Sequence, residues 1–201
     1  MTVPSVTPAG TTPDDLTALA RGVRLLLFDV DGVLTDGRIL LHADGSESKQ
    51  YHIRDGTGLV LARRSGLLTG LLSARTSAST TERARQLQIP IVRQGASDKL
   101  TVYQEILAEH GLADGEVAFM GDDVQDLPVL TRVGLSCAPA DAVPEVRARS
   151  RWISSRGGGA GAVRELIELV LRAQGTWDEL VSAYLLAEAP ADTGPGGEKR
   201  G

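Results

Sequence analysis

Carboxylate side chains follow two of the short apolar segments in this sequence. Asp29 and Asp31 come directly after the run Leu25–Phe28, and Asp122 closely follows a second run, Val117–Met120. Such a run is typical of a strand buried on both faces of a parallel sheet, and alternation along the strand would point Asp29 and Asp31 the same way. Carboxylates held close together repel each other unless a cation or a proton lies between them. The spacing therefore predicts a site for a hard dication such as Mg²⁺, which prefers oxygen ligands.

The same residue types fit phosphoryl transfer. Asp29 is the candidate nucleophile, because a carboxylate that attacks phosphorus gives an aspartyl-phosphate, and Asp31 can protonate the leaving alkoxide and later deprotonate water. Ser73 follows a third apolar run and can donate its hydroxyl to phosphoryl oxygens, while Lys99 can add positive charge to the same group. Asp122 would complete the ligands of a Mg²⁺ ion that neutralises charge in the transition state. Taken alone, the Asp-x-Asp-Gly pattern fits an acidic turn after a core strand equally well.

Short apolar runs alternate with helical patterns along the chain, which predicts an α/β fold with a doubly wound parallel sheet. Strands are expected at Arg24–Val30, Leu67–Leu72, Ile89–Val92, Val117–Met120, Gly134–Ala138 and Arg151–Ser154. Helices are expected at Asp14–Arg21, Leu59–Ser65, Ser79–Gln86, Ser97–His110, within Val124–Val133, and at Val143–Arg149, Ala162–Gln174 and Trp177–Ala187. Because ligands bind at the carboxyl ends of parallel strands, Asp29, Ser73 and Asp122 are expected to converge on one crevice.

Length and composition restrict the classes of function. The 201 residues suit a single domain, expected over residues 14–187, between a leader (1–13) and a tail (188–201) whose polar composition predicts disorder. The net charge of −5 and the aromatic content of 3% argue against a nucleic-acid or membrane surface. No apolar run is long enough for a membrane span. The single cysteine, Cys137, excludes an internal disulfide, so the cytoplasm is the expected compartment.

Four motifs, in order, resemble those of the haloacid dehalogenase-like phosphatase superfamily. They are Asp29-Val30-Asp31-Gly32-Val33-Leu34-Thr35, Ser73, Lys99, and Gly121-Asp122-Asp123 with Asp126 just beyond. The resemblance covers about Val23 to Gln174, and an ordered set of this kind rarely arises by chance. It implies that Asp29 is the nucleophile, that Asp31 is the acid/base, and that Mg²⁺ is held by Asp29, the backbone carbonyl of Asp31 and Asp122.

The spacing between these motifs leaves no room for a cap domain over the site. A helix and a strand after Asp55 take about 18 of the 44 positions from Asp29 to Ser73, which leaves room only for a β-hairpin at about 38–53. The 26 positions from Ser73 to Lys99 are filled by one helix and one strand. An uncapped phosphoryl site is open to water, so the neighbouring subunit of an oligomer is expected to cover it.

Further segments resemble the capless sugar-acid phosphatase branch of this superfamily, which includes enzymes of lipopolysaccharide sugar synthesis. They are the hairpin, His52-Ile53-Arg54-Asp55-Gly56-Thr57-Gly58, Gln94–Leu100, Gly121–Val129 and Gly158–Glu165. The resemblance implies a homotetramer that hydrolyses 3-deoxy-D-manno-octulosonate 8-phosphate, with substrate contacts from Asp31, His52, Ile53, Arg54, Asp55, Gly56, Arg75, Arg83 and Lys99. Arginine suits this role because it binds the carboxylate of a sugar acid with two parallel hydrogen bonds.

The substrate and even the class of activity stay open at this point. The second motif reads Ser73-Ala74-Arg75 where the family usually has Thr-Gly-Arg, so the phosphate of a nine-carbon acid, such as 2-keto-3-deoxynononate 9-phosphate or acylneuraminate 9-phosphate, fits as well. A phosphotransferase and a non-catalytic oligomerisation partner of a nucleotidyltransferase also fit the resemblance. The presence of both Asp29 and Asp31 favours an enzyme. Asp126 fits either a helix cap or a residue that orients Lys99.

Overall fold

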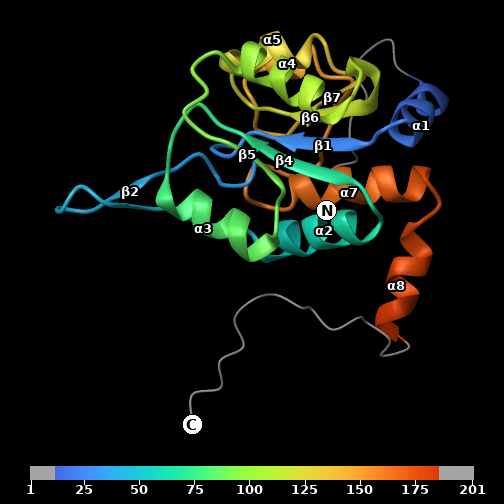
Figure 1. Cartoon of the computed structure of the whole chain (residues 1–201), viewed down its shortest axis with the longest axis horizontal. Helices are drawn as coiled ribbons and strands as arrows, with labels where there is room; N and C mark the ends of the chain where they lie inside the picture. The colour runs from blue at the N-terminus through green and yellow to red at the C-terminus, as the bar shows by residue number, and fades with distance from the viewer. Residues whose placement is uncertain (1–11, 186–201) are drawn as a thin grey trace.

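A parallel sheet forms the centre of the computed structural model, which describes residues 12–185 (Figure 1). In spatial order its six strands are β5 (Ile91–Arg93), β4 (Leu68–Leu72), β1 (Leu25–Phe28), β6 (Val117–Met120), β7 (Leu135–Ala138) and β8 (Trp152–Ile153). All neighbouring pairs are parallel. The predicted doubly wound parallel sheet is therefore confirmed, with β1 between β4 and β6.

Helices cover both faces of this sheet (Figure 1). The helices are α1 (Pro13–Arg21), α2 (Ile53–Arg64), α3 (Ala78–Leu87), α4 (Lys99–His110), α5 (Leu127–Leu130), α6 (Pro144–Arg147), α7 (Ala162–Ala173) and α8 (Trp177–Leu185), with short 3₁₀ turns η1 (Asp114–Glu116) and η2 (Val124–Asp126). Side chains of β1 alternate between two buried clusters. Leu26 and Phe28 pack in the cluster that includes α7, whereas Leu25 and Leu27 pack in the cluster that includes α4.

Most predicted boundaries lie within two residues of the observed ones, apart from those of α2, the hairpin and the α5 region. Thr12 caps α1 and Pro13 is its first residue, so the helix begins inside the predicted leader. The rest of that leader, the predicted tail and the last two residues of the predicted helix Trp177–Ala187 lie outside the described residues. Within residues 12–185, no helix combines the length and apolar character needed to cross a bilayer.

Helix α2 begins six residues before its predicted start at Leu59. The prediction failed there because Gly56 and Gly58 are typical of a loop. Both glycines instead allow close packing. A Cβ atom on Gly56 would lie 2.4 Å from Nη2 of Arg83, and one on Gly58 would lie 3.1 Å from side-chain atoms of α7. Tertiary packing thus outweighs the low helix propensity of glycine.

The predicted hairpin is present, but its strands are shorter than expected. They are β2 (Leu40–Leu41) and β3 (Glu47–Ser48), and they form a separate antiparallel pair that projects from the body of the molecule (Figure 1). An isolated pair of strands buries little surface and is marginal in water. Leu40 is 62% exposed and Leu41 is 70% exposed. Between Asp29 and Ser73 the described chain contains this hairpin, α2 and β4, and no cap domain.

The glycine-rich segment 157–161 packs against the loop that follows β1. The N–H of Gly159 donates to the carbonyl of Val33 at 2.9 Å, and the N–H of Gly158 donates to the carboxylate of Asp141 at 2.9 Å. A Cβ atom on Gly158 would lie 1.8 Å from the carbonyl oxygen of Gly32. Only glycine permits two backbones to approach this closely, so this segment supports the loop that carries the first motif.

We expect Gly158→Ala to destabilise the fold by about 3 kcal/mol, because two backbone segments must separate to admit the methyl group. Thermal denaturation should then show a midpoint about 6–12 °C lower than that of the original protein. Gly115→Ala is the matched control, since a Cβ atom there meets no atom within 4 Å. Equal midpoints for the two variants would contradict this role of Gly158.

Candidate active site

Three neighbouring strands place polar residues at one edge of the sheet. Asp29 follows β1, Ser73 follows β4 and Asp122 follows β6 after a single glycine. The register pairs Phe28 with Leu71 and with Met120, so the three strands end at the same level. Asp29 and Ser73 are buried, at 3% and 2% exposure. The edge therefore brings together side chains that are far apart in sequence.

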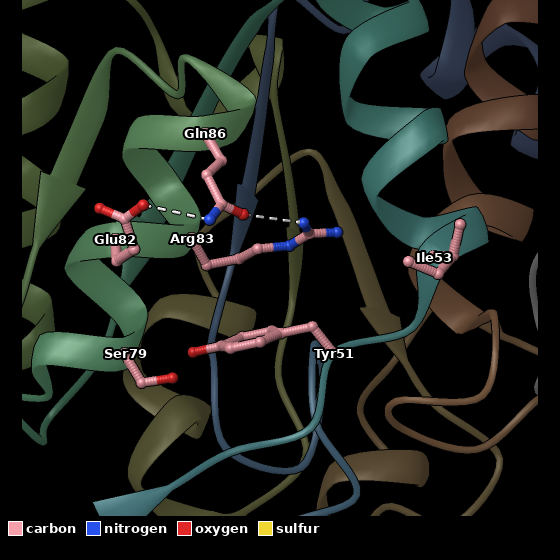
Figure 2. Close-up of a pocket in the computed structure, with 6 residues that line it drawn as sticks. All are labelled: Tyr51, Ile53, Ser79, Glu82, Arg83 and Gln86. Atoms are coloured by element: carbon pink, nitrogen blue, oxygen red, sulfur yellow. Dashed lines mark hydrogen bonds between the residues drawn. The ribbon is translucent and has the colours of Figure 1, made fainter. Parts of the chain in front are cut away.

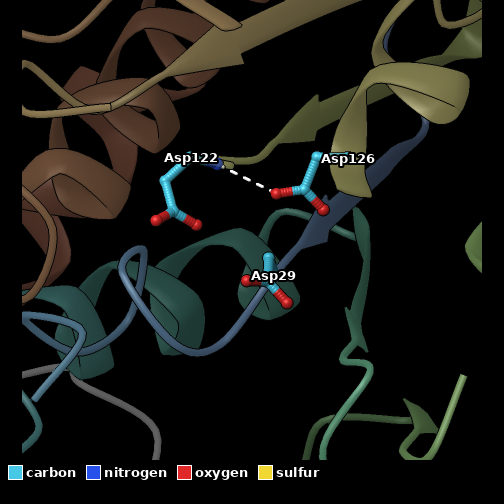
Figure 3. A group of neighbouring side chains, drawn as sticks. All are labelled: Asp29, Asp122 and Asp126. Atoms are coloured by element: carbon cyan, nitrogen blue, oxygen red, sulfur yellow. Dashed lines mark hydrogen bonds between the residues drawn. The ribbon is translucent and has the colours of Figure 1, made fainter. Parts of the chain in front are cut away.

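Asp29, Asp122 and Asp126 form a carboxylate cluster at this edge (Figure 3). One carboxylate oxygen from each residue lies within 4.8 Å of the other two. Gly32 leaves room for the cluster, because a Cβ atom on Gly32 would lie 2.0 Å from Oδ2 of Asp122. Gly32 also has a φ of +87°, a backbone conformation that favours glycine.

Lys99 neutralises part of the carboxylate cluster. It is the first residue of α4, and its Nζ lies 2.8 Å from Oδ1 of Asp29 and 2.6 Å from Oδ1 of Asp126. The other oxygen of Asp126 accepts hydrogen bonds from the backbone N–H groups of Asp122, at 3.0 Å, and Asp123, at 3.3 Å. Asp126 therefore both orients Lys99 and caps the loop after β6. Since both of its oxygens are engaged, Asp29 and Asp122 are the members best placed to bind a further cation.

Burial and mutual repulsion make these carboxylates hard to ionise. Burial, followed by the charges of Asp29, Asp126 and Asp123, raises the pKa of Asp122 to about 8. Burial and then the charge of Asp126 raise the pKa of Asp29 to about 6, although Lys99 opposes this shift. Burial also acts against the charge of Lys99, but Asp29 and Asp126 outweigh it and raise the lysine pKa. The cluster therefore has more negative charge than Lys99 alone can compensate.

The donor set of the carboxylate cluster fits a hard divalent cation. Oδ1 of Asp122 is buried and has no hydrogen-bond partner. Oxygen ligands of this kind suit Mg²⁺, which prefers carboxylates, carbonyls and water. A cation at Asp29 and Asp122 would supply the positive charge that the cluster lacks, and the side chain of Asp31 lies outside the cluster.

Asp31 contacts a second lysine, Lys49, which was not predicted from the sequence. Nζ of Lys49 lies 2.7 Å from Oδ1 and 3.0 Å from Oδ2 of Asp31. Arg75 lies 3.6 Å from Asp31 and 2.8 Å from Glu47, which is itself 3.8 Å from Lys49. The alternation Glu47-Ser48-Lys49 could have indicated this, since residues two apart in a strand face the same side.

The other residues expected to contact substrate lie around the first turn of α2. His52 precedes α2, and its side chain is 31% exposed. Arg54 is exposed. Asp55 is 1% exposed and accepts a hydrogen bond from the N–H of Arg164 at 2.8 Å, so its side chain connects α2 to α7. Gly56 is likewise buried, against Arg83.

A cavity of about 280 Å³ lies between this first turn and α3 (Figure 2). Its lining comprises Tyr51, Ile53, Ser79, Glu82, Arg83 and Gln86. The guanidinium group of Arg83 lies 5.9 Å from the centre of the Tyr51 ring and donates to Gln86 at 3.3 Å. Ile53 is 74% exposed at the edge of the cavity. Of the expected substrate residues, Ile53 and Arg83 thus line this cavity, whereas Lys99 contacts the carboxylate cluster and Arg75 lies beside Asp31.

We expect Mg²⁺ to stabilise the fold more strongly as the pH rises. The folded-state pKa of Asp122 is raised from 3.8 to about 8, so the stability contributed by its protonated form is complete below pH 3.8 and is lost as the pH rises through about 8. A cation that displaces this proton binds best at high pH. Millimolar MgCl₂ should raise the melting temperature by several degrees at pH 8.5 and by about 1 °C or less at pH 5.

The variant Asp122→Asn is the control for this measurement. Its side chain has no titrating proton and is a weaker ligand, so the Mg²⁺-dependent gain should be small at both pH values. A gain in the original protein that is equal at pH 5 and pH 8.5 would contradict the assignment of Asp122.

Comparisons with known proteins identify the family to which this chain belongs. The family description "haloacid dehalogenase-like hydrolase" matches residues 67–165. The 3-deoxy-D-manno-octulosonate 8-phosphate phosphatase KdsC of Escherichia coli K12 is 41% identical over 165 residues, which cover 82% of this chain and 88% of the relative. A crystal structure of a probable YrbI family phosphatase from Pseudomonas syringae pv. phaseolica aligns with a TM-score of 0.84 at 44% identity, over 86% of this chain and 98% of that chain.

A further solved structure is that of 3-deoxy-D-manno-octulosonate 8-phosphate phosphatase from Moraxella catarrhalis, in complex with a magnesium ion, a phosphate ion and a KDO molecule. It aligns with a TM-score of 0.84 at 33% identity, over 86% of this chain and 99% of that chain. These likenesses extend over most of both chains. This chain belongs to the haloacid dehalogenase-like hydrolase family, in the branch of phosphatases that includes KdsC.

Proposed function

We propose that this protein is a Mg²⁺-dependent phosphoric monoester hydrolase whose substrate is 3-deoxy-D-manno-octulosonate 8-phosphate. The observation that carries the proposal is the carboxylate cluster at the carboxyl end of β1, with Lys99 bonded to Asp29 at 2.8 Å. The substrate follows from the KdsC relatives, which are phosphatases of this sugar acid. Asp29, the backbone carbonyl of Asp31 and Asp122 would hold the Mg²⁺ ion, which when bound neutralises charge on the phosphoryl group.

The reaction proceeds in two steps at Asp29. An oxygen of the Asp29 carboxylate attacks phosphorus, the bond from phosphorus to the sugar oxygen breaks, and Asp31 transfers its proton to that departing oxygen. Water then attacks phosphorus and transfers a proton to Asp31, the bond from phosphorus to Asp29 breaks, and inorganic phosphate leaves. Lys99 offsets charge beside Asp29 throughout, and the hydroxyl of Ser73 donates to a phosphoryl oxygen.

Basic residues around the site would recognise the sugar acid. Arg75 is half exposed beside Asp31, and Arg83 contributes to the lining of the 280 Å³ cavity. A guanidinium group binds a carboxylate with two hydrogen bonds, which separates a sugar acid from a neutral sugar phosphate. The same substrate would be contacted at the start of α2 by His52, Ile53 and Arg54. The buried residues Asp55 and Gly56 would hold this turn in place.

The protein works as a homotetramer in which a neighbouring subunit covers each site. Support comes from the absence of a cap domain within residues 12–185 and from two leucines that are 62% and 70% exposed on the hairpin. Exposed apolar side chains that lie next to each other are typical of an interaction surface. We assign the enzyme to the cytoplasm and its globular domain to residues 14–187.

A substrate panel with added Mg²⁺ tests the reaction. The original protein should release phosphate from 3-deoxy-D-manno-octulosonate 8-phosphate faster than from nine-carbon acid phosphates or neutral sugar phosphates, and a chelator should abolish this release. Asp29→Asn should lower turnover at least about 10³-fold because the nucleophile is lost. Asp36→Asn, in the same loop but on an exposed side chain, should keep turnover within about twofold. A preference for neutral sugar phosphates would overturn the proposed substrate.

Charged substitutions on the hairpin test the assembly. Leu40→Asp combined with Leu41→Asp should convert a tetramer into smaller species, because burying unpaired carboxylates in an interface costs free energy. Size-exclusion chromatography with light scattering measures the mass, and the smaller species should have lower activity. Leu185→Asp is the control, since this leucine is 81% exposed on α8, away from the hairpin. A fully active monomer of the original protein would contradict the assembly.

A further inference from the structure

Each aspartate of the Asp29-Val30-Asp31 motif contacts its own buried lysine. Lys99 contacts Asp29 and is held in turn by Asp126. Lys49 contacts Asp31 at 2.7 Å, and Glu47 lies 3.8 Å from the same ammonium group. The side chains of both lysines are 1% exposed. A buried lysine with a second carboxylate nearby thus faces each of the two aspartates, but Asp126 accepts a hydrogen bond from Lys99 at 2.6 Å, whereas Glu47 lies beyond hydrogen-bond distance of Lys49.

Lys49 reaches Asp31 from a different part of the fold. It follows β3 of the hairpin, whereas Asp31 belongs to the loop after β1. Glu47 also accepts a hydrogen bond from Arg75, after β4, at 2.8 Å. Two cations and two carboxylates thus connect the base of the hairpin to the ends of two central strands. Within the described residues this network is the polar link between the hairpin and Asp31.

Stability alone gives a weak reason for burying Lys49. Removing a lysine ammonium from water costs free energy that a nearby carboxylate only partly returns. The side chains of Asp31 and Glu47 are 19% and 17% exposed, so water could solvate both without a buried lysine. The shorter of its two contacts, at 2.7 Å, places the ammonium group against Asp31, the carboxyl group that gives up and regains a proton in the proposed reaction. A role in the reaction explains the arrangement better than a role in folding.

We propose that Lys49 is a positioning residue that acts through Asp31. Lys49 fixes the direction of the Asp31 carboxyl group towards the leaving oxygen, and it offsets the negative charge that Asp31 acquires when it gives up its proton. Glu47 holds Lys49 in place. Its negative charge also offsets part of the positive charge of Lys49 and Arg75, which both face Asp31. This inference rests on the proposed phosphatase reaction, and it concerns the protonation of the leaving group rather than the attack on phosphorus.

Reaction rates on substrates with different leaving groups distinguish this role of Lys49 from a general structural role. An alkyl phosphate, such as the sugar-acid phosphate, needs a proton on its leaving oxygen, whereas p-nitrophenolate leaves as a stable anion. We expect Lys49→Met to lower the single-turnover rate on the alkyl phosphate about 30-fold, part of what general acid catalysis supplies. The initial burst of p-nitrophenolate from p-nitrophenyl phosphate should change less than about threefold. Equal losses on both substrates, or no loss on either, would overturn the proposal.

A matched variant and a second substitution control for charge and for folding. Arg38→Met also removes one positive charge next to the hairpin, but its side chain is 90% exposed and lies 3.9 Å from Asp36, so both rates should stay within about twofold of the original. Glu47→Gln leaves Lys49 in place but weakens its hold, and it should give a smaller loss, about tenfold, on the alkyl phosphate only. This variant tests the proposal even where Lys49→Met unfolds.

A double-mutant cycle with Asp31→Asn completes the test. If Lys49 acts through Asp31, Lys49→Met should lower the alkyl-phosphate rate by less than about threefold once Asp31 is already asparagine. A further tenfold loss in that background would show an independent effect and would overturn the proposal. The original protein distinguishes this outcome from failure of the proposed function. If it releases no phosphate from either substrate with Mg²⁺, the phosphatase assignment fails, whereas uniform losses in active variants contradict only the role of Lys49.

Discussion

Repulsion between buried carboxylates is the constraint on which the site depends. The parallel sheet places β1 and β6 side by side, so the buried Asp29 and the half-buried Asp122 meet at one edge of the sheet. Burial raises the pKa of both groups, and like charges at this distance must be compensated. Lys99 compensates one negative charge of the carboxylate cluster, and a divalent cation would compensate the negative charge that remains. Lys99 and the expected cation both offset the repulsion that the strand order creates, and Asp126 adds a negative charge but holds Lys99 in place.

The close approach of backbones makes this arrangement possible. Gly32 leaves space for the carboxylate of Asp122, and Gly158 lies against the carbonyl of Gly32 from the other side. Any larger residue at either position would push the loop after β1 away from the cluster. Because protein interiors are close-packed, a displacement here would be transmitted to Asp29. The glycine-rich segment 157–161, far from Asp29 in sequence, thus contributes to the geometry of the site through packing alone.

The sheet could be predicted from the sequence because each central strand is a short, continuous apolar run. The start of α2 could not, since Gly56 and Gly58 indicate a loop locally and are helical only because α3 and α7 pack against them. Asp29, Ser73, Lys99 and Asp122 could be identified because ordered motifs mark them. Lys49 belongs to no such motif. The alternation Glu47-Ser48-Lys49 indicates only that Glu47 and Lys49 share a face. That this face meets Asp31 depends on how the hairpin packs against the loop after β1, which no local pattern encodes.

The two proposals assign the hairpin two roles, one in assembly and one beside Asp31. Strand β2 carries the exposed leucines Leu40 and Leu41, the expected contact with a neighbouring subunit, and the base of the hairpin carries Lys49 and Glu47 beside Asp31. A neighbouring chain that orders the hairpin would at the same time fix the ammonium group that faces the acid/base. Isolated two-stranded hairpins are only marginally stable, so in a single chain the direction of Asp31 would depend on a weakly held element. If both proposals hold, assembly and proton transfer would be coupled through the ion pair between Lys49 and Asp31.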